Sequence, residues 1–252
     1  MLNKTILITG ATSGIGEAAA RIFAANKYNI IITGRRKERL DKLAEELRKQ
    51  NVEVLTLCFD VRNNIEVEKS ISSLHSNWKN IDVLINNAGL ASGLGPIQNG
   101  ELDDWEKMID TNIKGLLYVT RAVSPLMIAR NSGHIINIAS LAGKDVYPNG
   151  NVYCATKHAV DALSRSMRID LLPHGIKVTN IAPGLVETEF SVVRFHGDKE
   201  KADNVYKGYQ PLTATDIADA IWYAASRPAH FCVNDMVLTP LAQANAYLVN
   251  KK

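Results

Sequence analysis

Short apolar runs alternate with longer amphipathic segments along most of the chain. The apolar runs are rich in Ile, Val and Leu, as is typical of strands buried on both faces of a parallel sheet; they occupy residues 5–9, 29–33, 52–59, 81–86, 134–139, 176–181 and 235–239. The segments between them repeat apolar positions at helical spacing, which predicts helices at residues 14–26, 37–49, 65–78, 102–129, 152–172 and 214–226. The pattern therefore predicts an α/β fold, a doubly wound parallel sheet of about seven strands with helices on both faces.

One segment interrupts this alternation. Residues 187–209 are charged, contain two glycines and show no clean period. We expect them to form a mobile, partly helical flap over a binding site. No repeat, linker or low-complexity stretch divides the chain, so we expect a single domain spanning residues 1–252.

Composition and charge exclude several classes of protein. Hydrophobic residues make up 46% of the chain and charged residues 22%, an ordinary globular balance. The formal net charge is +3 and no basic tract occurs, so we expect no nucleic-acid partner. The chain has no apolar run of about 18 residues, so we expect no membrane span.

The cysteines and histidines indicate neither disulfides nor a metal. Cys58, Cys154 and Cys232 lie in apolar stretches and cannot all pair within one chain, which suggests buried, reduced thiols. The six histidines show no metal-ligand spacing, so we predict no metal site. The N-terminus shows no secretory signal pattern, and together these features predict a cytoplasmic protein.

The turn between the first predicted strand and helix is rich in glycine, reading Thr9-Gly-Ala-Thr-Ser-Gly-Ile-Gly16. At this place an open parallel sheet of the Rossmann type binds a dinucleotide, with the pyrophosphate at the helix N-terminus. The first glycine permits the tight turn, the second lets phosphate approach the backbone, and the third lets the helix pack close to the sheet. The predicted pyrophosphate site comprises Gly10, Thr12, Ser13, Gly14, Ile15 and Gly16. A plain glycine turn is the alternative.

The end of the second strand indicates which dinucleotide binds. An NAD site places Asp or Glu there to accept a hydrogen bond from the ribose 2′-hydroxyl. This chain has Arg35 and Arg36 instead, and guanidinium groups pair with a 2′-phosphate. We therefore predict NADP(H) as the cofactor. The alternative is that both arginines simply begin a solvated helix.

Two further strand ends lie on the same predicted edge. Asp60 follows the third strand, where its carboxylate could accept from the adenine amino group while Val61 packs on the ring. Asn87, Ala88 and Gly89 follow the fourth strand and leave space under the adenosine ribose. Each would pass for a turn residue if it stood alone.

Tyr153 and Lys157 form the candidate catalytic pair. They are four residues apart in a predicted helix and so lie on one face, one turn apart. A fixed ammonium near a tyrosine favours the phenolate and lowers its pKa, which lets the pair exchange a proton with a substrate oxygen. Ser140 ends the fifth strand, where its hydroxyl could hold the same oxygen.

Taken in order, these motifs carry a family resemblance. With Asn112 and Pro183-Gly184, they resemble the short-chain dehydrogenases/reductases over essentially the whole length of the chain. The resemblance implies a catalytic tetrad of Asn112, Ser140, Tyr153 and Lys157, with Tyr153 as general acid/base. It further implies that Lys157 binds the nicotinamide ribose and that Asn112 holds a water of a proton relay. The segment that would cradle the nicotinamide and phosphates includes Pro183, Gly184, Val186 and Thr188.

A narrower resemblance suggests a substrate. Gly34-Arg35-Arg36, residues 87–96 and Glu189-Phe190-Ser191 with Arg194-Phe195 are similar to the branch that oxidises 3-hydroxy acids such as serine, L-allo-threonine and 3-hydroxypropionate. The branch implies a homotetramer in which the two long predicted helices, residues 102–129 and 152–172, form one interface. We also expect the apolar tail, residues 241–252, to dock on a neighbouring subunit. Arg194 lies in the flap, where it could pair with a substrate carboxylate; a solvated surface charge is the alternative.

Two other functions stay open at this point. The same fold could reduce a different carbonyl, such as a 3-ketoacyl thioester or a small ketone. A non-catalytic protein that senses NADP is also possible, although a sensor has no need for Tyr153 and Lys157 together.

Overall fold

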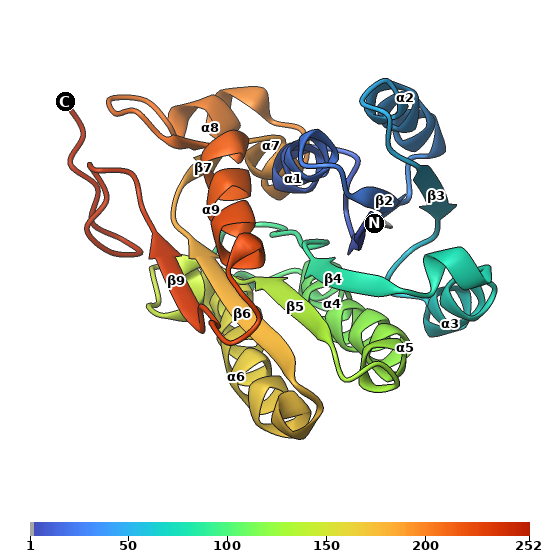
Figure 1. The fold of residues 1–252 in the computed structure, drawn as a ribbon. Coiled ribbons are helices and arrows are strands. Elements are labelled where there is room, and N and C mark those ends of the chain that lie inside the picture. The colour runs from blue at the N-terminus through green and yellow to red at the C-terminus, as the bar shows by residue number, and fades with distance from the viewer. Residues whose placement is uncertain (1–2) are drawn as a thin grey trace.

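The structure is a computed structural model that describes residues 3–252. Its main sheet has seven parallel strands in the order β3-β2-β1-β4-β5-β6-β9 (Figure 1). The strands are β1 (Thr5–Ile8), β2 (Asn29–Gly34), β3 (Val54–Cys58), β4 (Ile81–Asn86), β5 (Gly133–Ile138), β6 (Ile176–Pro183) and β9 (Asp235–Leu238). The doubly wound parallel sheet predicted from the sequence is confirmed. Strand order reverses between β1 and β4, and such switch points are where α/β sheets bind ligands.

Helices cover both faces of this sheet (Figure 1). α1 (Gly14–Ala25), α2 (Lys37–Arg48) and α9 (Ala214–Ser226) pack on one face, and α3 (Asn64–Ser72), α5 (Leu116–Ile128) and α6 (Asn151–Leu171) pack on the other. Alternate strand residues supply the two cores: Ile6 and Ile8 join the first, and Leu7 joins the second. All three are fully buried, as the continuous apolar runs predict.

One predicted helix is too long, and another has the predicted extent but is irregular within it. The helix expected at residues 65–78 ends at Ser72, and only a 3₁₀ turn, Ser76–Trp78, follows. The hydroxyls of Ser72 and Ser73 donate to the carbonyls of Lys69 and Ser70, and such local bonds compete with helix continuation. The helix expected at residues 102–129 is divided by a π-helical turn, Asp110–Gly115, between α4 (Leu102–Ile109) and α5.

The segment expected to form the flap contains two short helices, α7 (Phe190–Arg194) and α8 (Lys199–Asn204). A small parallel sheet lies at its base, where β7 (Val186–Glu187) pairs with β8 (Leu212–Thr213). Two-residue strands leave no period in a sequence, and this sheet was not predicted. It joins the end of β6 to the start of α9.

One thiol is not where the sequence predicts it. Cys154 is buried and Cys232 half-buried, but Cys58 is exposed. Cys58 is the last residue of β3, an edge strand with a neighbour on one side only, so an apolar run does not ensure burial there. Within residues 3–252, no helix combines the length and apolar character needed to cross a membrane.

Candidate active site

A cleft runs along the carboxyl edge of the sheet, bounded by the glycine turn, the ends of five other strands and the start of the flap. Most predicted site residues line it, namely Gly10, Thr12, Ser13, Gly14, Ile15, Arg35, Arg36, Asp60, Val61, Asn87, Ala88, Gly89, Ser140, Tyr153, Lys157, Pro183, Gly184, Val186 and Thr188. Three lie outside its lining: Gly16 under the turn, Asn112 behind Gly89, and Arg194 in an adjoining hollow. Parallel strands thus bring residues from distant parts of the sequence to one edge.

The glycine turn requires glycine for two reasons. Gly10 and Gly14 have φ angles of +65° and +57°, in the left-handed region that side chains disfavour. A Cβ on Gly16 would lie 2.5 Å from the Asn87 Nδ2 and 2.6 Å from the Gly10 carbonyl oxygen. The turn therefore keeps α1 packed close beneath it.

Asn87 fastens this turn to β4. Its Nδ2 donates to the carbonyls of Thr9 at 2.9 Å and Gly10 at 3.1 Å. The Thr9 hydroxyl oxygen accepts from the backbone N–H groups of Asn87 and Ala88, both at 3.0 Å. Asn87 thus holds the two strand ends together, a role beyond leaving space.

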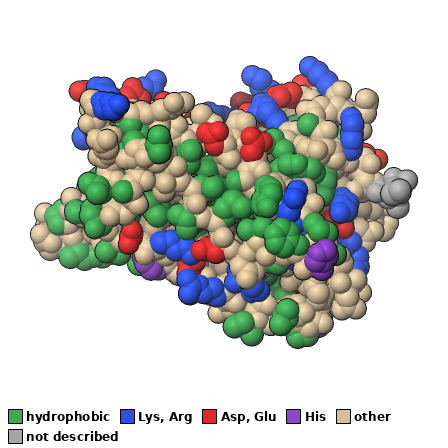
Figure 2. All heavy atoms as spheres, turned by 60° about the vertical axis from the view of Figure 1, so that its left-hand side comes forward, with side chains coloured by type: hydrophobic (Ala, Val, Ile, Leu, Met, Phe, Trp, Pro, Cys, Tyr) green, Lys and Arg blue, Asp and Glu red, His purple; other side chains and the backbone are tan. Residues whose placement is uncertain are grey.

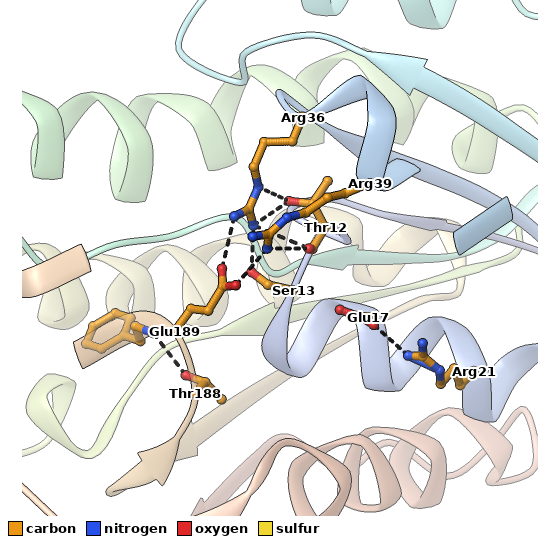
Figure 3. A network of polar contacts seen from close by, with 9 residues as sticks. Thr12, Ser13, Glu17, Arg21, Arg36, Arg39, Thr188 and Glu189 are labelled. Atoms are coloured by element: carbon orange, nitrogen blue, oxygen red, sulfur yellow. Dashed lines mark hydrogen bonds and ion pairs between the residues drawn. The ribbon is translucent and has the colours of Figure 1, made fainter. Parts of the chain in front are cut away.

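Arg36, which immediately precedes α2, reaches across to the glycine turn (Figure 3). Its Nε and Nη2 donate to the Thr12 hydroxyl at 3.1 and 2.9 Å, and its Nη2 donates to the Ser13 hydroxyl at 2.9 Å. Arg39, one turn further along α2, lies beside it, and both guanidinium groups bind Glu189. Arg35 points elsewhere, with its Nη1 3.8 Å from an Asp60 carboxylate oxygen.

Asp60 and Val61 lie at the adenine end of the predicted site. Arg62 donates to Asp60 through its Nε at 3.0 Å and Nη2 at 2.7 Å. Partial burial raises the pKa of Asp60, but the bonds from Arg62 outweigh it, so the pKa falls below its ordinary value. Val61 is buried against Gly115, where a Cβ would approach within 2.7 Å of its Cγ2. The carboxylate is therefore ionised and fixed at the cleft edge.

Ser140, Tyr153 and Lys157 meet where β5 and α6 approach the cleft. The Ser140 hydroxyl donates to the Pro183 carbonyl at 3.3 Å and accepts from the Ala142 N–H at 3.0 Å. Tyr153 and Lys157 come from successive turns of α6 and are more than nine-tenths buried. The Lys157 Nζ lies 5.9 Å from the centre of the Tyr153 ring.

Burial acts on the pKa of both members of this pair. Burial raises the pKa of Tyr153; the hydrogen bond with Ser140 and the charge of Arg194 act in the opposite direction. Burial also lowers the pKa of Lys157 to about 8, and its Nζ donates to the Ile138 carbonyl at 2.9 Å. Arg194 is thus a second cation beside Tyr153, 5.6 Å from the ring centre, in addition to Lys157.

Asn112 is set by the π-helical turn. Its Oδ1 accepts from the Leu90 N–H at 2.9 Å, and its Nδ2 donates to the Leu90 carbonyl at 2.8 Å and to Thr156 at 3.0 Å. Gly89 separates it from Lys157: a Cβ there would lie 3.3 Å from the Asn112 Oδ1 and 3.4 Å from the Lys157 Nζ. π-Helical turns occur frequently at functional sites because they redirect side chains. The expected water relay stays a prediction.

Arg194 extends from α7 toward the end of the cleft at which Tyr153 lies. Its Nη2 donates to the Tyr147 hydroxyl at 2.7 Å, and its guanidinium carbon lies 5.6 Å from the centre of the Tyr153 ring. The buried Nε has no hydrogen-bond partner among the described residues. A cation therefore stands beside the candidate acid/base with donor capacity to spare.

Four residues of this region have no individual role in the sequence analysis: Arg39, Tyr147, Glu189 and Phe190. Phe190 packs edge-on against Tyr153, with ring centres 5.7 Å apart. Arg39 carried a usable signal, since it follows Arg35 and Arg36 by three or four residues on a predicted helix. Tyr147 and Phe190 lie outside any periodic pattern, and only the fold brings them to Tyr153.

Comparison with known proteins agrees with this geometry. The family profile for short chain dehydrogenase matches residues 4–199, so the chain belongs to the short-chain dehydrogenase family.

Relatives within this family are similar over nearly full length. The NADP-dependent 3-hydroxy acid dehydrogenase YdfG of Salmonella typhi is 51% identical, over 96% of this chain and 97% of the relative. The serine 3-dehydrogenase of Agrobacterium fabrum is 44% identical over 97% of both chains, and sulfoacetaldehyde reductase 2 of Chromohalobacter salexigens is 46% identical over 99% and 100%. The closed form of a serine dehydrogenase complexed with NADP⁺ superposes with a TM-score of 0.92, at 46% identity, over 98% and 99% of the two chains.

Proposed function

We propose that this protein catalyses the reversible, NADP-dependent oxidation of small 3-hydroxy acids to the corresponding 3-oxo acids. The observation that carries the proposal is the Arg194 guanidinium beside Tyr153, 5.6 Å from its ring, at the end of a dinucleotide cleft. A 3-hydroxy acid presents a hydroxyl to one group and a carboxylate to the other. The names of the similar dehydrogenases support the same assignment.

The chain has the residues to hold NADP(H). The glycine turn would bind the pyrophosphate at the N-terminus of α1. Gly10 and Gly14 have backbone conformations that a residue with a Cβ disfavours, and without a Cβ they let phosphate approach the backbone. Arg36 and Arg39 would bind the 2′-phosphate of the adenosine ribose, and Asp60 with Val61 would flank the adenine. The bound cofactor supplies the hydride acceptor for oxidation and the hydride donor for reduction.

Tyr153 would exchange the proton of the substrate oxygen. Burial keeps its hydroxyl protonated, so in the reductive direction it can donate to the carbonyl oxygen. In the oxidative direction it must first be ionised, which nearby positive charge favours. Ser140 would orient the same oxygen, Lys157 would bind the ribose hydroxyls, and Asn112 would hold the water that returns the proton to solvent.

Arg194 would select the acid substrate. Its planar guanidinium can form paired, charge-assisted hydrogen bonds with a carboxylate, and Tyr147 already holds it in place. A sulfonate carries the same charge and similar oxygens, so sulfoacetaldehyde, named for one relative, tests how far this selection extends. Neutral ketones and alcohols would lack the contact.

The proposal is tested by a substrate panel monitored through reduced-nicotinamide absorbance. The panel contains L- and D-serine, L-allo-threonine, 3-hydroxypropionate, sulfoacetaldehyde in the reductive direction, a 3-ketoacyl thioester and simple secondary alcohols, each with NADP and with NAD. We expect turnover of the hydroxy acids with NADP. Turnover of neutral substrates alone would replace the 3-hydroxy acid by another carbonyl compound, and NADPH binding without any turnover would favour a sensor.

Replacing Arg194 tests the carboxylate contact directly. Arg194→Ala should raise KM for a 3-hydroxy acid about 10- to 100-fold, the value of a charge-assisted pair, and leave KM for a neutral alcohol unchanged. Arg194→Lys keeps the positive charge but not the paired N–H donors of a guanidinium, so its KM for the acid should lie between those of the wild type and Arg194→Ala. Equal effects on acid and alcohol would reject the role.

The proposal includes the quaternary structure and location expected from the sequence. A homotetramer in the cytoplasm is consistent with the exposed apolar side chains described below and with three cysteines that form no disulfide within residues 3–252.

A further inference from the structure

The carboxylate of Glu189 lies between two guanidinium groups at the rim of the cleft (Figure 3). Its Oε2 accepts from the Arg36 Nη1 at 2.9 Å, and its Oε1 accepts from the Arg39 Nη1 at 2.7 Å. The bonds from these arginines hold the pKa of Glu189 below its ordinary value, so the group is an anion. An anion of the chain itself thus occupies the arginine pair.

These are the groups that a 2′-phosphate needs. The Nε and Nη2 of Arg36 are already bound to Thr12 and Ser13, so its Nη1 is the nitrogen that faces outward to an anion. That nitrogen binds Glu189. A phosphate that approached the pair would either displace the carboxylate or meet its negative charge at close range.

The ion pairs between Glu189 and the two arginines are weak enough for another anion to replace the carboxylate. The side chains of Arg36, Glu189 and Arg39 are 43%, 46% and 47% exposed, and ion pairs this open to water are weak and sensitive to salt. A phosphate group with up to two negative charges would compete well for the same donors.

Glu189 also connects this rim to the reacting end of the cleft. It immediately precedes α7, whose first residue, Phe190, packs on Tyr153 and whose last residue, Arg194, reaches the Tyr153 ring. Movement of Glu189 away from the arginines would therefore loosen the start of the flap.

We propose that Glu189 is a specificity-determining residue that competes with the 2′-phosphate of the cofactor for Arg36 and Arg39, and that this exchange couples the phosphate subsite to α7. The inference rests on the proposed NADP dependence. In the absence of phosphate the carboxylate holds the arginines and anchors the flap; when phosphate binds, the anchor is released. Glu189 thereby sets the affinity for the cofactor without touching its reactive part.

Calorimetric titration with adenosine 2′,5′-bisphosphate and with adenosine 5′-monophosphate tests the competition, because the two probes differ only in the 2′-phosphate. Glu189→Gln removes the charge at nearly constant shape. It should bind the bisphosphate about three- to tenfold more tightly than the wild type, the value of two exposed ion pairs, and bind the monophosphate equally. The difference should shrink as salt is raised.

Glu187→Gln is the matched control. Glu187 is exposed on β7 two residues away and makes no ion pair within residues 3–252, so the same change of charge should leave both affinities unaltered. Unchanged or weaker bisphosphate binding by Glu189→Gln, with a wild type that prefers the bisphosphate, would overturn the competition and leave the proposed cofactor intact. A wild type that binds both probes equally would overturn both.

Hydrogen exchange in the unmodified protein tests the coupling independently of any variant. Saturating adenosine 2′,5′-bisphosphate should speed amide exchange in residues 190–194 by at least about threefold, whereas the monophosphate should not. Equal exchange with the two probes would overturn the link between the phosphate subsite and α7.

Discussion

The pKa of Tyr153 is subject to opposing influences from its neighbours. Burial and the nearby Tyr147 raise its pKa, while Ser140 and Arg194 lower it. The sequence indicates Lys157 as the cation that lowers this pKa, and the lysine amine lies 5.9 Å from the Tyr153 ring centre and donates to the Ile138 carbonyl. The same two residues thus remain the proposed pair, with their charges arranged by neighbours from other elements.

Removal of the Tyr153 hydroxyl should separate turnover from cofactor binding. In Tyr153→Phe the ring still packs on Phe190, so the fold and the affinity for NADPH should be kept within about twofold. The rate of 3-hydroxy acid oxidation should fall about 10²- to 10⁴-fold, the contribution of a general acid/base. Steady-state assays and NADPH fluorescence titration measure the two quantities. Substantial turnover by this variant would remove Tyr153 from the mechanism.

At the scale of elements, short segments position the cleft. The π-helical turn places Asn112 beside Gly89, and the two-residue sheet of β7 and β8 joins the end of β6 to α9. α9 begins with a capping box, in which the Thr213 hydroxyl accepts from the Asp216 N–H while the Asp216 carboxylate accepts from the Thr213 N–H. Since Thr213 also belongs to β8, this cap fixes the helix and the small sheet together.

Loss of the cap should therefore destabilise the protein. Thr213→Ala should lower the free energy of unfolding by about 1 kcal/mol, the usual cost of removing an N-cap side chain. Thr213→Ser keeps the hydroxyl and should retain most of it. Urea denaturation at one fixed protein concentration measures both. If the alanine and serine variants have the same free energy of unfolding, the hydrogen bond to the residue 213 hydroxyl does not contribute measurably to stability.

At the scale of the molecule, apolar side chains remain exposed on the face that carries β9 and the C-terminal segment. Figure 2 turns this side of the molecule forward and shows hydrophobic side chains across its middle. Leu241 is fully exposed, and Tyr247 and Leu248 are 64% and 57% exposed. A second copy of the chain would cover such a surface in the proposed homotetramer.

A charge on this face should disrupt the assembly. Leu241→Glu should convert the tetramer to a smaller species in sedimentation velocity, because a carboxylate buried in an apolar interface loses its hydration. Ile65→Glu is the control, since Ile65 is 77% exposed on α3, far along the sheet from β9. Identical sedimentation of both variants and the wild type would exclude the tail from the interface.

The sequence by itself determined the parallel sheet, its two layers of helices and most residues of the cleft. Continuous apolar runs and helical spacing are local properties of the chain, and the glycines at residues 10 and 14 meet local backbone needs. Tyr153 and Lys157 are one helical turn apart, so the sequence also predicted that they lie close together.

Only the tertiary structure decided how the side chains of distant elements meet. Glu189 binds Arg36 across 153 positions of sequence, and Arg194 reaches Tyr147 from a segment without any period. The direction of the Lys157 amine and the π-helical turn at Asn112 likewise depend on neighbours packed from other elements. Periodicity records which face of an element is buried, whereas these contacts depend on which elements the sheet order places side by side.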